Sequence, residues 1–221
     1  METLELKQRI IENKDWATIL FVVALVLVAL TRSLFENRFN EFIKLMVTNK
    51  YLKIYRDGGN TQSWFTIALF TVQIISFAFF IQLLFSYFGY TTKTNGISYI
   101  QIITLLGSFV LSKYLVEKII ATSFNIEEFN EQLNLQKVSY RTYIGLLLLP
   151  VNIVLFYNDK PPIVVIYVLI FIVIATNMLT YIVSLKNYQN LIKSKFFYFI
   201  LYLCALEIAP YYFMYYWFTK R

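Results

Sequence analysis

The sequence contains no histidine and a single cysteine, Cys204. A disulfide within one chain needs two cysteines, and the common zinc, haem and acid–base sites depend on histidine. Disulfide frameworks, histidine-ligated metals, haem with an axial histidine and histidine-based catalysis are therefore excluded. We expect no cofactor.

Small residues and helix breakers are also scarce. The chain has six glycines and four prolines, against 21 phenylalanines and 18 tyrosines. Helices that slide past one another usually need small residues for close approach and Gly or Pro breaks. The composition therefore indicates bulky, static helices and disfavours a transporter that moves through large conformational changes.

Apolar residues dominate what is present, at 58% of the 221 residues. A bilayer-spanning helix needs roughly 20 mostly apolar residues. Six stretches meet this requirement or come close to it: residues 16–34, 64–88, 97–118, 142–157, 163–185 and 196–218. The sequence predicts an all-α polytopic membrane protein with about six transmembrane helices, built as one membrane domain over residues 1–221.

Two polar connections are predicted to form amphipathic helices lying along the membrane surface. In segment 35–56, apolar residues recur at helical spacing between charged ones: Phe35, Phe39, Phe42 and Met46. Segment 123–138 shows the same pattern at Ile126, Phe129 and Leu133. These segments are either connectors packed on the inner leaflet or a docking surface for another protein.

The net charge of +7 would suggest nucleic acid in a soluble protein, but its placement suggests membrane topology. Thirteen Lys and Arg residues flank the connections after the first, third and fifth helices, and two lie in the other connections. The positive-inside rule places the basic connections in the cytoplasm and both termini in the periplasm. We expect a lipid partner and no nucleic acid.

Catalytic motifs are missing as well. The sequence has no GxSxG, HExxH, CxxC or phosphate-loop pattern, and its acidic residues lie mainly in polar segments mixed with lysines. We therefore expect a protein that is not an enzyme.

An intramembrane polar cluster is the main candidate site. Glu207 lies eleven residues into stretch 196–218, about 16 Å from its end at ~1.5 Å per residue. Amides fall at similar depth in three other stretches, at Gln73, Asn152 and Asn177. A charge at this depth is costly and normally has a partner, so four helices are predicted to meet in one polar layer.

Two prolines accompany this layer. Pro150 and Pro210 each remove a backbone hydrogen bond and are predicted to kink their helices, leaving carbonyls that neighbours must satisfy. In one interpretation the cluster fixes helix register, with Glu207 protonated because burial raises a carboxyl pKa. In the second, Glu207 carries protons or binds a cation or a basic group of a partner, and in the third it faces a helix of a partner subunit.

Charges at the inner membrane edge have ordinary explanations. Arg141 is predicted to meet lipid phosphate or to pair with Glu117, and Lys113 and Glu117 have the i,i+4 spacing of a helix-surface ion pair.

Two blocks of sequence resemble a known family. LQKVSYRTYIGLLLLPVNIVLFY and KFFYFILYLCALEIAPYY are similar to the signature blocks of a Bacteroidota family of multi-pass inner-membrane proteins, catalogued as a domain of unknown function. The resemblance implies a Gram-negative inner membrane and emphasises five residues: Arg141, Gly145, Pro150, Glu207 and Pro210. It implies no activity.

Three functions are compatible with these features. The first is a non-enzymatic inner-membrane subunit that scaffolds or assembles a larger envelope complex, such as a type 9 secretion or gliding apparatus. The second is a small transporter or proton-coupled carrier that uses Glu207, and the third is a membrane enzyme acting on lipid. Other membrane protein subunits are the expected partners of the first.

The variant Glu207→Gln tests the role of the buried acid. Glutamine keeps the size and hydrogen-bonding capacity of a protonated glutamate, so we expect normal membrane yield and thermal stability in detergent, and normal complementation of a deletion strain. A variant that assembles normally but fails to complement would show instead that Glu207 must ionise.

Overall fold

The described part of the chain is entirely helical apart from its connections. The computed structural model describes residues 14–46, 50–55, 63–123, 127–158, 163–187 and 216. These contain α1 (Asp15–Leu34), α2 (Glu36–Ile43), the 3₁₀-helix η1 (Lys44–Met46), α3 (Lys50–Ile54), α4 (Trp64–Tyr87), α5 (Gly96–Ser123), α6 (Glu127–Tyr157) and α7 (Ile163–Asn187). The predicted all-α class is confirmed for this part.

Four of these helices are long and apolar enough to cross a membrane: α1, α4, α5 and the Asn130–Tyr157 part of α6. A shorter apolar stretch, Ile163–Met178, belongs to α7. The predicted stretch 196–218 lies outside the described residues. The chain therefore has the helices of a membrane protein.

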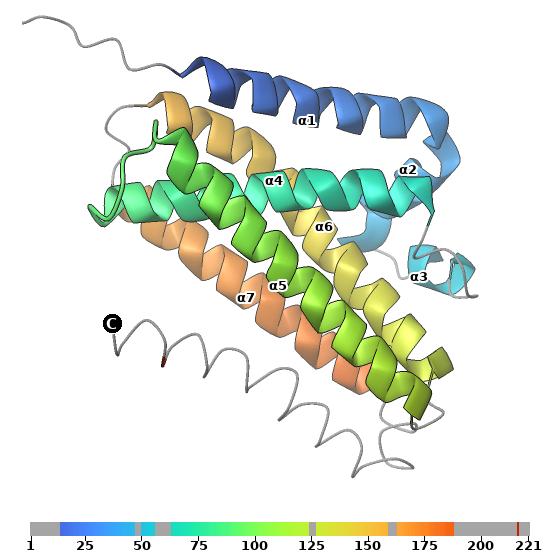
Figure 1. The fold of residues 1–221 in the computed structure, drawn as a ribbon. Helices are drawn as coiled ribbons and strands as arrows, with labels where there is room; N and C mark the ends of the chain where they lie inside the picture. Colours follow the sequence, from blue (N-terminus) through green and yellow to red (C-terminus); the bar gives the residue numbers. More distant parts are fainter. Residues whose placement is uncertain are drawn as a thin grey trace, which may run out of the picture.

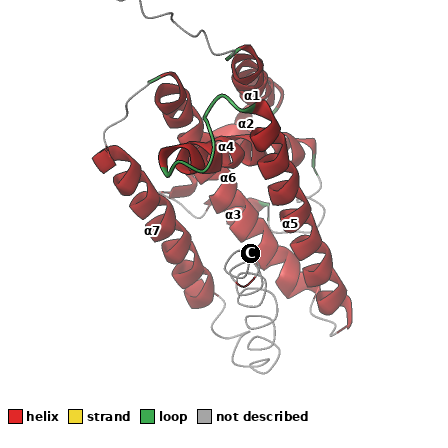
Figure 2. Ribbon diagram, turned by 60° about the vertical axis from the view of Figure 1, so that its left-hand side comes forward, coloured by secondary structure: helices red, strands yellow, loops and turns green. Residues whose placement is uncertain are grey.

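Helix α4 is the centre of the bundle. It packs against α1, α5 and α6, and Figure 1 shows it crossing the middle of the molecule with α1 along one side. Half of its apolar window is buried, against 6% of that of α5. The side chain of Ser63 caps its first turn by accepting a hydrogen bond from the Thr66 backbone N–H. Figure 2 shows α5 and α7 on opposite sides of the bundle.

The helix boundaries differ most from the prediction at α6. Segment 123–138 and stretch 142–157 were predicted as separate helices, but from Glu127 the two form one uninterrupted helix. The residues between them, Ser139, Tyr140 and Arg141, include no Gly or Pro, so nothing ends the helix where the hydropathy changes. Much of the first half of α6 is also buried, including Gln132, Gln136 and Lys137, whereas Glu127 and Glu131 are exposed.

In the predicted segment 35–56, the residues that the structure describes form three short helical pieces, α2, η1 and α3. Phe39 and Phe42 on α2 turn inward, where they pack with Tyr51 on α3 and Phe65 on α4. The helical spacing of Phe39 and Phe42 thus gives α2 an apolar face, and this face packs against the protein at this end of the bundle.

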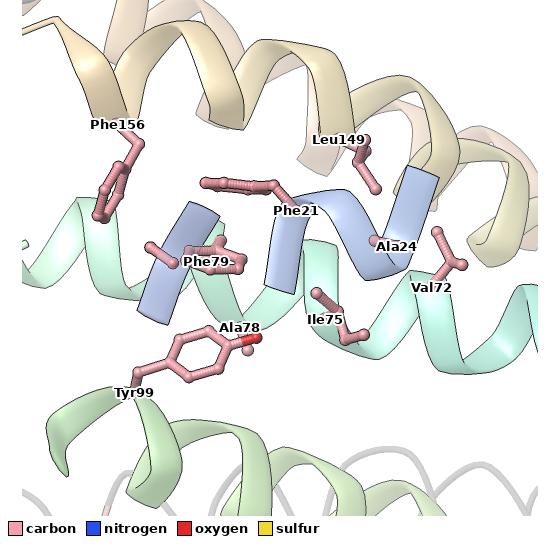
Figure 3. Close-up of a cluster of buried hydrophobic side chains, with 10 residues drawn as sticks. Phe21, Ala24, Val72, Ile75, Ala78, Phe79, Tyr99, Leu149 and Phe156 are labelled. Carbon is pink, nitrogen blue, oxygen red and sulfur yellow. The ribbon is translucent and has the colours of Figure 1, made fainter. Parts of the chain in front are cut away.

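An aromatic cluster holds the opposite end together. Phe79 on α4 is completely buried, and its ring centroid lies 4.1 Å from that of Phe21 on α1 and 4.4 Å from that of Tyr99 on α5. Phe156 on α6 meets Phe79 edge to face at 5.9 Å. Figure 3 shows these rings pointing toward one another from four helices. Such pairs add a geometric preference to the contact area that they bury.

Replacing Phe79 tests the importance of this cluster. We expect Phe79→Ala to lower the free energy of unfolding by about 3 kcal/mol, because it leaves a cavity where four helices meet. Thermal unfolding in detergent measures the effect.

The control is Phe85→Ala on the same helix, where 40% of the side chain is exposed. We expect it to change the unfolding temperature much less. Equal losses in the two variants would contradict a central role for Phe79.

Candidate functional site

The contact between α4 and α6 is unusually close at Gly145. A Cβ atom placed on Gly145 would lie 3.0 Å from the Cα atom of Gln73 and 3.0 Å from its Cγ atom. Backbones approach this closely only where one residue lacks a side chain. Gly145 therefore sets the separation of the two helices.

Gln73 uses this proximity to make a buried hydrogen bond. The hydroxyl of Thr142 on α6 donates to Gln73 Oε1 at 2.8 Å, and both side chains are about 95% buried. In an apolar environment such a bond cannot be exchanged for water, so it favours one rotation of α6 against α4.

Asn152 makes the second polar link between the same helices. Its side chain is completely buried, and Nδ2 donates to the backbone oxygen of Ser76 at 2.7 Å and to the Ser76 hydroxyl at 3.2 Å. Its Oδ1 is buried and accepts no hydrogen bond from any described residue. One acceptor therefore remains at the centre of the interface.

The described members of the predicted polar cluster do not bond to one another. Gln73 and Asn152 lie in the same α4–α6 interface but bond different partners. Asn177 on α7 donates to the Val173 carbonyl of its own helix at 2.7 Å. Glu207 and Pro210 lie outside the described residues.

Pro150 sits inside α6 on an exposed position. The helix continues past it to Tyr157. The proline ring thus faces away from the α4–α6 interface, while Asn152, two residues later, faces into it.

Lys113 and Glu117, near the predicted inner membrane edge, do not project from the helix surface as in an exposed ion pair. Glu117 is 4% exposed, and the Nζ atom of Lys113 is buried, so both side chains turn into the protein rather than outward. Arg141 is half-buried next to Thr142 on α6. The sequence showed the i,i+4 spacing of Lys113 and Glu117. It did not show which side of α5 is covered by the rest of the protein.

Arg38 organises the end of the bundle where α2, α3 and α4 meet. Its Nη1 donates to the Ser63 hydroxyl at 2.8 Å, and its guanidinium lies 4.6 Å from the ring centroid of Tyr55 and 4.7 Å from that of Phe65. Cation–π contacts of this kind stabilise a partly desolvated arginine. Arg38 thereby joins the cap of α4 to two short helices.

Tyr51 on α3 lies in the same group. Burial raises the pKa of its phenol, and the positive charge and hydrogen bond of Arg38 partly oppose that rise. A phenol with a raised pKa stays neutral over the physiological pH range, so Tyr51 serves here as an uncharged partner of Arg38.

Sequence reasoning missed Ser76, Thr142 and Arg38. Serine and threonine are common in membrane helices, and the positions of Ser76 and Thr142 become informative only when a facing amide is known. Arg38 was counted as one of many cytoplasmic cations, and its aromatic neighbours come from separate segments.

The arrangement supports a structural role more directly than a chemical one. The α4–α6 interface contains amides, hydroxyls and a glycine, which fix register and separation. Among the described residues, no three His, Cys, Asp or Glu side chains are grouped so that they could hold a metal ion.

The variant Gly145→Ala tests the close approach of α4 and α6. We expect it to lower the free energy of unfolding by about 1–3 kcal/mol, because the new methyl group overlaps the Gln73 backbone and side chain. Thermal unfolding in detergent measures this loss.

Gly107→Ala is the matched control, because nothing lies within 4 Å of a Cβ atom at that position of α5. It should stabilise the helix by about 0.5–1 kcal/mol, the ordinary advantage of alanine over glycine. An equal gain in Gly145→Ala would rule out the steric constraint.

Comparisons with known proteins identify the chain at the level of a family. A family model described as a domain of unknown function, DUF4271, matches residues 17–218, which is nearly the whole chain and includes both sequence blocks discussed above. Comparison with curated proteins and with solved structures finds no match. The family resemblance predicted from those blocks is confirmed: the chain belongs to the family described as domain of unknown function DUF4271.

Proposed function

We propose that this protein is a non-enzymatic subunit of a larger membrane complex, which it scaffolds or helps to assemble. Four helices with the length and composition of membrane spans support its place in a bilayer. The interlocked α4–α6 interface and the aromatic cluster around Phe79 support a rigid body rather than a moving carrier.

The observation that carries the proposal is a polar stripe on the outer face of α5. It consists of four exposed residues at intervals of three, four and four positions: Gln101, Thr104, Ser108 and Ser112. This spacing places them on one side of the helix. None of the four side chains makes a hydrogen bond to a residue that the structure describes.

Such a stripe is unfavourable against lipid. Lipid chains offer no hydrogen-bond partner, whereas serine, threonine and glutamine side chains commonly bond between packed membrane helices. Exposed apolar residues interleave with the stripe, including Leu105 and Leu115, so the face is also large enough for helix packing. A membrane helix of another subunit, carrying its own hydroxyl or amide groups, would satisfy it.

The charge distribution supports an orientation for this subunit. The basic connections lie in the cytoplasm and both termini in the periplasm if the protein follows the positive-inside rule. The two signature blocks suggest the inner membrane of Bacteroidota. A type 9 secretion or gliding apparatus is then a candidate complex by association.

The double variant Ser108→Leu/Ser112→Leu tests the stripe. After purification in mild detergent, mass spectrometry of the wild type should find a stoichiometric membrane partner. We expect the double variant to retain about tenfold less of it, because it loses two interhelical bonds of roughly 0.6 kcal/mol each and gains bulk at the contact.

The matched control is Val22→Leu/Val26→Leu on the exposed face of α1, which also adds bulk to an outward surface. It should retain the partner at the wild-type level. A wild-type protein that purifies as a clean monomer or homodimer would overturn the proposal.

A further inference from the structure

A polar cavity of about 220 Å³ lies between the last turns of α5 and the first turns of α6. Its principal polar lining comes from both helices: Tyr114, Lys118, Thr122, Asn130, Glu131 and Asn134. We call it the α5–α6 pocket. It is separate from the α4–α6 interface and from the polar stripe of α5.

The lining follows from the helical repeat. Tyr114, Lys118 and Thr122 are each four residues apart on α5, and Asn130 and Asn134 are four apart on α6. Each set therefore lies along one side of its helix, and the two polar sides face each other across the pocket.

Two buried amides indicate that the pocket is built for a polar occupant. Asn130 is 7% exposed and Asn134 is 6% exposed, yet both line the cavity. Neither side chain hydrogen-bonds to another residue within the described ranges. Buried amides are normally satisfied, so these two need partners inside the pocket.

Charge at the mouth of the pocket defines the chemistry of that occupant. Lys118 on α5 is an exposed cation, whereas Glu127 and Glu131 on α6 are exposed anions. An ammonium group suits the two carboxylates, and a phosphate suits Lys118 with the amide and hydroxyl donors. The complementary ligand is a zwitterion that carries a primary ammonium and a phosphate.

The size of the pocket agrees with a small head group. Its volume of about 220 Å³ lies below the roughly 300 Å³ at which sites for drug-sized ligands begin. A phosphoethanolamine group contains only eight non-hydrogen atoms, so its size is compatible with this volume, and the lipid tail would lie outside the pocket.

The lengths of the two helices place the pocket near the membrane surface. α5 has 28 residues and α6 has 31, which correspond to about 42 and 46 Å, whereas the hydrocarbon core is about 30 Å thick. Their adjoining ends are polar, so they extend beyond the hydrocarbon into the head-group region.

We infer that the α5–α6 pocket binds the phosphoethanolamine head group of a membrane lipid. Lys118 and the amides hold the phosphate, and Glu127 and Glu131 accept hydrogen bonds from the ammonium. This inference rests on the membrane location in the proposed function, but it does not depend on a protein partner.

Native mass spectrometry of the full chain tests the assignment. The detergent-purified protein is mixed with equal amounts of phosphatidylethanolamine, phosphatidylglycerol and phosphatidylcholine. We expect at least fivefold preferential retention of phosphatidylethanolamine, because the other two lack a primary ammonium. Glu131→Gln should remove most of this preference, and Lys118→Met should weaken retention of all three lipids.

Glu36→Gln is the matched control, since it removes an exposed carboxylate of α2 far along the chain from the pocket. It should leave the lipid preference unchanged. Soluble glycerophosphoethanolamine forms a second arm: binding of this compound with no preference among the lipids would assign the pocket to a free aminophosphate instead.

Equal retention of the three lipids by the wild type, without binding of the soluble compound, would overturn the inference. An unchanged preference in Glu131→Gln would overturn it as well. Either result leaves the subunit proposal intact if a stoichiometric partner is recovered. Conversely, a preference for phosphatidylethanolamine in a protein that has no partner would support the lipid site and contradict the subunit proposal.

Discussion

The close contact of α4 with α6 at Gly145 is the constraint on which the rest of the structure depends. Because Gln73 lies directly against the glycine, the helices approach near enough for Thr142 to reach Gln73 and for Asn152 to reach Ser76. These bonds fix the rotation of α6 about its axis. That rotation then brings Phe156 to the aromatic cluster at one end and carries the polar first half of α6 toward α5 at the other.

The packed centre of the bundle supports structure, so the candidate binding surfaces lie on the outside of the helices. Two interior amides, Gln73 and Asn152, join α4 to α6, and the rings around Phe79 fill the space between α1, α4, α5 and α6. Two polar features of the described helices are open to the outside: the stripe of α5 and the α5–α6 pocket. We propose that the first binds a protein helix and that the second binds a lipid head group.

The helices themselves could be predicted well, and their polar contacts could not. Apolar runs located α1, α4 and α7 to within a few residues. They failed at the first half of α6, because Gln132 and Lys137 look like surface residues in a hydropathy pattern although both are buried. In the candidate site, the sequence drew attention to Gln73 and Asn152, which are buried in the structure, but their partners Thr142 and Ser76 carried no signal of their own.

The sequence by itself determined the helical class and the apolar stretches long enough to cross a membrane, and it excluded a histidine side chain and a disulfide within the chain. These follow from composition and from order along the chain. Only the tertiary structure decided that Gly145 faces Gln73, that Asn177 bonds within its own helix and that Asn130 and Asn134 line a pocket. Such contacts depend on the rotation and crossing of helices, which packing sets and which one amphipathic pattern leaves undetermined.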